Sequence, residues 1–182
     1  REQLAGEVVS NLAKPYTVSQ GQHGTCNVKI LDVLLNAKHP DKVADMISEV
    51  ATTGKYTLPS GEVVNVPAGT LKPAQDASHH PRWNGERGFA GQIFDSTVIN
   101  AHLQSNNMSF RFDQVPITDE IKSGDVYVDN KTDEVLTGVD GKPAEFKGLY
   151  VSQIVEAYRL VMGNNDSSRD WILDPISDTG PT

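Results

Sequence analysis

The chain has 182 residues, 37% of them hydrophobic and 22% charged, which is enough apolar sequence to build the core of one packed domain. A formal net charge of -8 without a cluster of Lys and Arg argues against nucleic-acid binding through phosphate contacts. No run of about eighteen apolar residues occurs, so no membrane-spanning helix is expected. A single cysteine excludes an internal disulfide framework and leaves the compartment open.

The first third of the chain predicts two helices separated by a glycine-containing loop. Apolar residues at helical spacing predict a helix over Glu2–Ala13, which Pro15 ends. Residues 16–19 are expected to be extended and to lead into the loop at 20–24. The helix predicted from Cys26 to about Ala37 is apolar on most of its faces, and we therefore expect it to be the central buried helix.

The middle of the chain alternates helices with short extended segments. A proline and an acidic residue at its start and a glycine at its end predict a helix from Pro40 to about Gly54. Turn residues between two extended segments predict a hairpin of residues 56–58 with 62–66. A further helix is expected over about 88–104, followed by a strand at 108–112. The proline- and glycine-containing residues 67–87 predict a long irregular loop, and such loops in compact domains are often functional.

The last third predicts a second hairpin and a final helix. Residues 126–128 and 134–136 are expected to pair through the turn at 130–133. A helix over Leu149–Met162 is expected to turn Tyr150 and Val151 toward the core, and residues 164–182 form a polar tail. Helices with interspersed hairpins predict an α+β fold for a single domain over residues 1–182.

The loop before Cys26 carries the residues most suited to chemistry. A thiol has a pKa of about 8.5, and a helix N-terminus favours the reactive thiolate through its unpaired N–H groups and dipole. Attack on a carbonyl creates an oxyanion, which the backbone N–H of Cys26 and the side-chain amide of Gln20 could stabilise together if the loop folds back. Cys26 is therefore predicted to be a nucleophile and Gln20 its oxyanion-hole partner.

The segment Gln20-Gly21-x-x-Gly24-Thr25-Cys26 resembles the nucleophile segment of papain-like cysteine peptidases, Gln-Gly-x-Cys-Gly-Ser-Cys-Trp. The resemblance aligns Gln20 and Cys26 with the family's oxyanion glutamine and nucleophile without a gap. It implies a papain-like fold with a helical half whose central helix starts at Cys26, a cysteine protease activity on protein or peptide substrates, and no cofactor or metal. His23, Thr25 and Asn27 depart from the family pattern and mark a distant relative.

The resemblance also implies a base that this chain does not supply at the family position. The family's His and Asn follow the cysteine by about 130 to 150 residues, and no histidine occurs between Glu156 and Ile176. One expectation is that the chain is the N-terminal part of a papain-like domain, completed by a C-terminal β-rich segment or chain, for example after self-cleavage near Thr182. The alternative is a rearranged site with an internal base, for which His102 is the better candidate.

The remaining polar motifs have plainer interpretations. The pair His79-His80 lacks Cys or carboxylate residues at ligand spacing, so no metal site is predicted there. The segment Asp129–Asp133 lacks the glycine and closing glutamate of a calcium loop and predicts a solvated turn. Two further functions stay open: a thiol-dependent deamidase or transglutaminase, which would use the same nucleophile, and a non-catalytic binding domain on a peptidase-like scaffold.

Overall fold

The computed structural model of the chain describes residues 2–74 and 86–163, and one helix runs through its middle. This helix, α4 (Phe89–Ser105), contacts α1, α2, α3 and α5 as well as β2 and β3. Every residue of α4 from Ala90 to Leu103 is buried, which places the hydrophobic core around this helix.

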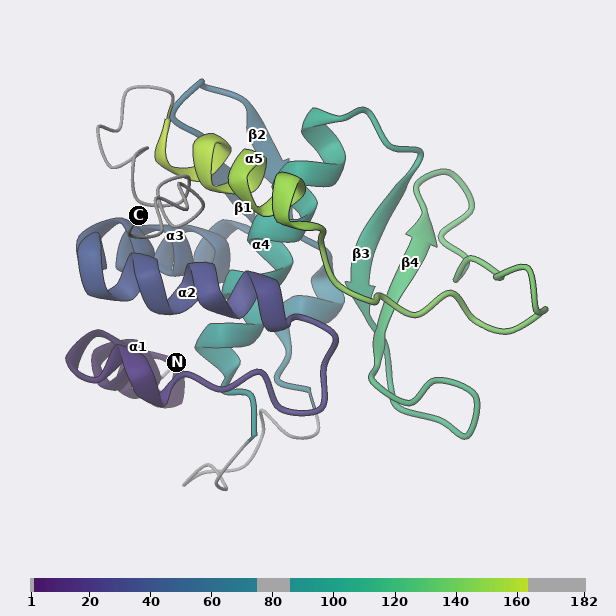
Figure 1. The fold of residues 1–182 in the computed structure, drawn as a ribbon, viewed down its shortest axis with the longest axis horizontal. Helices are drawn as coiled ribbons and strands as arrows, with labels where there is room; N and C mark the ends of the chain where they lie inside the picture. Colours follow the sequence, from purple (N-terminus) through teal and green to yellow (C-terminus); the bar gives the residue numbers. More distant parts are fainter. Residues whose placement is uncertain (1, 75–85, 164–182) are drawn as a thin grey trace, which may run out of the picture.

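The other helices cover α4 from one side of the molecule, and the β3–β4 ribbon lies on the other side (Figure 1). These helices are α1 (Glu2–Ala13), α2 (Cys26–Lys38), α3 (Pro40–Thr53) and α5 (Val151–Met162). Each of them has apolar residues on the face that meets the core, including Val28 and Leu31 of α2 and Val43 and Met46 of α3. None of the helices in the described ranges has the length and hydropathy required to cross a bilayer.

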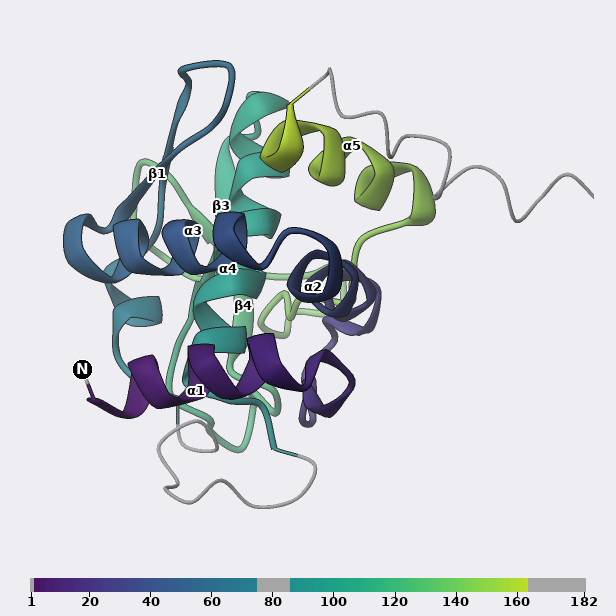
Figure 2. The same cartoon turned by 90° about the vertical axis from the view of Figure 1, so that its left-hand side faces the viewer.

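The described strands form two small antiparallel sheets. Strands β1 (Lys55–Thr57) and β2 (Val63–Asn65) make a hairpin, and the label β1 marks its place in Figure 2. Tyr56 lies opposite Val64 in this hairpin. Strands β3 (Phe110–Gln114) and β4 (Asp125–Asp129) pair with Phe112 opposite Tyr127. Two short 3-10 helices, η1 (Pro15–Thr17) and η2 (Ala68–Leu71), complete the elements of the described residues.

Most of the helices confirm the sequence-based expectation, because their apolar spacing is a local property. The first helix is confirmed at Glu2–Ala13, the second begins at Cys26 as predicted, and the third ends at Gly54, whose φ of 70° provides a left-handed C-cap. The first hairpin and the α+β class are confirmed as well.

Three expectations are wrong in detail. Helix α2 is not the central buried helix: Ile30 on it is 67% exposed, and α4 holds that place. Tyr150 and Val151 are exposed at the start of α5 rather than turned to the core. The expected extended segment at 16–19 begins within η1.

The second hairpin is confirmed in its pairing but is less regular than expected. Residues 134–136 pair antiparallel with β4 through a bridge between Val128 and Val135 and the backbone bonds of Glu134 and Leu136, while the regular strand partner of β4 is β3. The turn at Asp129–Asp133 is the expected solvated one, because Asp129 Oδ1 accepts the N–H groups of Lys131 and Thr132. Trp83, Trp171 and the pair His79-His80 lie outside the described residues.

The tight approach of Gly24 to the segment before α5 gives a test of the loop's position. A Cβ on Gly24 would lie 2.6 Å from the carbonyl oxygen of Phe146, whereas a Cβ on Gly6 in α1 would meet nothing within 4 Å. We expect Gly24→Ala to lower the free energy of unfolding by about 1–3 kcal/mol. Gly6→Ala is the matched control and should raise it by up to about 1 kcal/mol. Urea unfolding of both variants measures this, and an unchanged stability of Gly24→Ala would contradict the close contact.

Candidate functional site

Cys26 is the first residue of α2, and its side chain is exposed. Thr25 is the N-cap residue, but its side chain makes no capping hydrogen bond, and the first turn contains no acidic residue. The positive end of this 13-residue helix is therefore not neutralised by a cap or a carboxylate of its own first turn. The thiol donates a hydrogen bond to Asn27 Oδ1 at 3.7 Å. The sequence-predicted nucleophile is thus accessible and sits at a helix N-terminus.

The Gln20 side chain folds back onto its own loop. Its Nε2 donates to the backbone carbonyl of His23 at 3.3 Å, and Gly21 at φ 64° makes the turn that allows this. An amide nitrogen carries two hydrogens, so this bond occupies one and leaves the other for a second acceptor. The structure places Gln20 in the same loop as Cys26 with its amide bonded to a backbone group of the loop.

A second segment of the chain holds the loop from outside. Asn27 Nδ2 donates to the carbonyl of Leu149 at 2.7 Å, and Gly24 lies against the backbone of residues 146 and 147. Gly148 has a φ of 103°, a conformation that favours glycine at this contact. The start of α2 is therefore fixed to the segment that leads into α5.

A groove of about 780 Å³, here called the Asn27 groove, opens beside the start of α2. Its walls come from α2, α4, β3, β4 and α5, and its lining includes Asn27, His102, Phe110, Tyr127, Tyr150 and Glu156. Cys26 is not one of the lining residues and adjoins the groove through its neighbour Asn27. Apolar and polar side chains both contribute to this lining.

His102, the internal base candidate from the sequence, lies in this groove and is held by a carboxylate. Its Nδ1 is 3.0 Å from Glu156 Oε2, and Asn106 Nδ2 donates to Glu156 Oε1 at 3.0 Å. A carboxylate on Nδ1 fixes the ring and favours the proton on that nitrogen. The described hydrogen bonds of the Cys26 thiol do not include an imidazole, so the structure does not join His102 to Cys26 directly.

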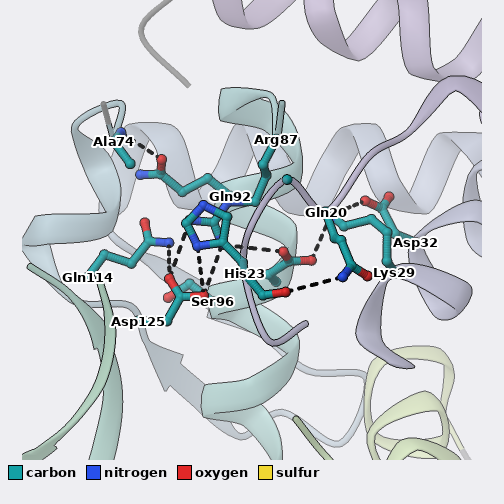
Figure 3. Close-up of polar contacts among 12 residues, drawn as sticks. Gln20, His23, Lys29, Asp32, Ala74, Arg87, Gln92, Ser96, Gln114 and Asp125 are labelled. Carbon is teal, nitrogen blue, oxygen red and sulfur yellow. Dashed lines mark hydrogen bonds and ion pairs between the residues drawn. The ribbon is translucent and has the colours of Figure 1, made fainter. Parts of the chain in front are cut away.

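A chain of buried charged side chains passes beneath the loop, here called the buried ion-pair chain (Figure 3). It begins on α2, where Lys29 Nζ lies 2.9 Å from Asp32 Oδ2 and 2.8 Å from Asp95 Oδ1 of α4. Arg87 continues it with NH1 3.6 Å from Asp95 Oδ2. Both NH groups of Arg87 donate to the carboxylate of Asp125 at 3.4 Å.

The chain ends at His23, whose Nδ1 lies 3.0 Å from Asp125 Oδ2. Asp125 also accepts a bond from Gln114 Nε2 at 3.0 Å. His23, Arg87, Gln114 and Asp125 line a cavity of about 470 Å³ on this side of the loop. The loop that carries Cys26 is thus tied through His23 to strand β4.

Burial and neighbouring charges oppose each other at these carboxylates. Burial raises the pKa of Asp32 to about 6, with Asp95 adding to the rise while Lys29 and Asn36 limit it. Burial also acts on Asp125, but Arg87, His23 and Gln114 outweigh it, and its pKa lies below the ordinary value. The pKa of Lys29 is raised because Asp32 and Asp95 outweigh the effect of its burial.

The described residues offer no alternative metal centre, and comparisons with known proteins do not add a site. Within residues 2–74 and 86–163, no three His, Cys, Asp or Glu side chains gather closely enough to hold a metal ion. Searches against protein-family models, curated proteins and solved structures find no match for this chain.

The sequence analysis does not predict the ion-pair chain. His23 and Asp125 lie 102 positions apart in the sequence. No local pattern connects two residues at that separation. The one available signal was that charged residues occur inside otherwise apolar helices, such as Lys29 and Asp32 in α2 and Asp95 in α4, because such residues are buried only when they are paired.

The raised pKa of Asp32 predicts a pH dependence of stability. The folded state holds a proton on this carboxyl up to a pH of about 6, whereas the unfolded chain releases it near 3.8. Stability from this group is therefore greatest at acidic pH and declines as the pH rises through 6. We expect the free energy of unfolding of the native chain, minus that of Asp32→Asn, to fall by about 2 kcal/mol between pH 4.5 and pH 7.

Urea unfolding of both proteins across this pH range measures the difference. Groups that titrate equally in the two proteins, including Asp125, cancel in the subtraction. A difference that stays constant with pH would show that Asp32 has an ordinary carboxyl pKa in the folded chain.

Proposed function

We propose that this chain is a cysteine hydrolase that cleaves peptide bonds through a thioester at Cys26. The observation that carries the proposal is the exposed thiol on the first residue of a helix whose N-terminus has no side-chain cap. The unpaired N–H groups and the dipole of a helix N-terminus can stabilise negative charge, such as the charge that develops when a thiol attacks a carbonyl. The cysteine lies on the helical side of the molecule, beside a groove that β3 and β4 also line.

The residues around the thiol suit the charge that the reaction creates. When Sγ attacks the carbonyl carbon, negative charge moves to the carbonyl oxygen, where the backbone N–H of Cys26 and the second N–H of Gln20 would donate. The leaving amine takes a proton as it departs, and water then hydrolyses the thioester to release the acid and restore the thiol. The Asn27 groove provides the surface along which a peptide would lie.

The base has two alternative sources in this proposal. His102 is the internal one, since it lines the same groove as Asn27 and Glu156 sets the orientation of its ring. The other is a histidine and asparagine from a C-terminal segment or chain that completes a papain-like site.

The same nucleophile could also transfer the acyl group of a glutamine side chain, so product analysis on glutamine-containing peptides distinguishes peptidase from deamidase or transglutaminase chemistry.

Two hydrogen bonds favour a second candidate, a non-catalytic binding domain. The described partner of the thiol is Asn27 Oδ1 rather than an imidazole, and the Gln20 amide is bonded to a backbone carbonyl. In that case the Asn27 groove would bind a peptide without cleaving it. Reaction of Cys26 with iodoacetamide at pH 6 separates the two: a rate above that of a free thiol favours the enzyme, and an equal rate favours the binding domain.

Substitutions in the loop test the roles of the nucleophile and its partner. Cys26→Ala should abolish cleavage of a peptide library followed by mass spectrometry, and it should leave the unfolding midpoint nearly unchanged because the side chain is exposed. Gln20→Ala should lower turnover by about 10²- to 10³-fold, as expected for the loss of one oxyanion donor. Gln22→Ala, an exposed neighbour in the same loop, is the control and should retain activity. Full turnover by Gln20→Ala would remove Gln20 from the mechanism.

A histidine substitution identifies the source of the base. If His102 serves, His102→Gln should lower kcat/KM by about 10²- to 10⁴-fold and abolish the acidic limb of the pH profile. His39→Gln is the control, because His39 lies at the N-cap position of α3 and does not line the Asn27 groove. Unchanged kcat/KM in His102→Gln would exclude His102 as the base.

A further inference from the structure

Among the residues that the structure describes, the buried ion-pair chain holds one more carboxylate than permanent cation. It contains three carboxylates, from Asp32, Asp95 and Asp125, and two permanent cations, Lys29 and Arg87. All five side chains are almost fully buried, and Arg87, Asp95 and Asp125 have no exposed surface. An uncompensated charge in such a place is costly, whereas a balanced set of ion pairs is tolerated.

The two ends of the chain differ in how they can supply the missing charge. Protonation of Asp32 would balance it, but that carboxyl takes up a proton only as the pH falls toward 6. Within the described part of the chain, the other group that can add a positive charge at neutral pH is His23, whose Nδ1 lies 3.0 Å from Asp125 Oδ2. Asp125 is shared with Arg87 at the longer distance of 3.4 Å, so the carboxylate has capacity for a second cation.

We propose that His23 is a positioning residue that is positively charged at neutral pH and anchors the loop of Cys26 to Asp125. The role of the loop in catalysis rests on the proposed function, but the charge on His23 and the anchoring of the loop do not. Loss of this charge as the pH rises leaves the buried chain with a net negative charge, and the contact that holds the loop weakens. The loop then separates from β4 at alkaline pH.

Several charged groups around His23 favour or oppose its protonated form. The carboxylate of Asp125 on β4 favours the protonated form of His23. Arg87, which precedes α4 and contacts the same carboxylate, opposes it. From α2 and α4 the favouring carboxylates of Asp32 and Asp95 are offset in part by Lys29. Lys72, at the end of η2, lines the same cavity from an exposed position where solvent screens its charge.

The anchor has a short connection to the thiol. His23 and Cys26 are three residues apart, and the backbone carbonyl of His23 also accepts the Gln20 amide. Release of the His23 side chain from Asp125 therefore frees the backbone carbonyl that orients Gln20 to move, while Asn27 still holds the start of α2. The cavity of about 470 Å³ that His23 and Asp125 line gives water a route to the imidazole, so proton exchange does not require unfolding.

Nitrogen-15 NMR of the full chain tests the charge directly. The His23 ring signals, assigned by their loss in His23→Gln, should show both nitrogens protonated at pH 7. Their titration midpoint should lie above that of the same histidine in a peptide of residues 19–27. Asp125→Asn keeps the shape of the partner but removes its charge, and the midpoint should fall in this variant. A neutral His23 at pH 7 would overturn the proposal.

Hydrogen exchange of the amides of residues 20–27 tests the anchoring without reference to catalysis. Protection factors should drop on the order of tenfold for each pH unit above the His23 midpoint, while those of α4 stay constant. His23→Gln should show the low protection at every pH, and His23→Lys, which keeps a charge through this range, should restore protection and abolish the pH dependence. A loop whose protection does not follow the His23 midpoint overturns the positioning role.

These outcomes separate this proposal from the proposed function. Failure of Cys26 to react or turn over refutes the hydrolase and leaves the NMR and exchange results unaffected. Where Cys26 is reactive, its rate of alkylation relative to a free thiol should change at the His23 midpoint in the native chain and not in His23→Lys. An alkylation profile that is identical in the two proteins counts against the anchor.

Discussion

The ion pairs of Arg87 are the constraint on which the rest of this structure depends. A guanidinium cannot lose its proton in a protein, so a buried arginine requires anionic partners that are buried with it. Arg87 meets this requirement with Asp95 on α4 and Asp125 on β4, and thereby joins the helical side of the molecule to the β3–β4 ribbon. Lys29 and His23 extend the connection to α2 and to the loop before it.

The same reasoning explains how a helix as polar as α4 can be fully buried. Its polar side chains bond to backbone groups of neighbouring elements: Asn100 exchanges two bonds with Phe112 of β3, and Gln92 donates to the carbonyls of Thr70 and Lys72. These side-chain to backbone hydrogen bonds hold η2 and β3 at a fixed distance from α4. Burial of polar groups is inexpensive only when each is paired, so these contacts specify the arrangement as well as stabilise it.

The candidate site lies where this rigid interior meets the surface. The thiol is exposed, but the backbone that carries it is held by Asn27 on one side and by His23 on the other. A reactive group on a fixed backbone can be placed accurately without being buried, which is the property that a nucleophile requires. The Asn27 groove then supplies a surface next to the thiol, with His102 held in it by Glu156.

The sequence by itself determined the helices and the position of Cys26 at the start of one of them. Apolar spacing, the stop at Gly54 and the turn at 59–61 are local signals, and they were sufficient for α1, α2, α3, α4 and the first hairpin. Only the tertiary structure decided which helix is central, that β4 pairs with β3, and that Tyr150 faces solvent. It alone brought His23 to Asp125, because a buried charge selects its partner by distance in space, which spacing along the chain does not encode.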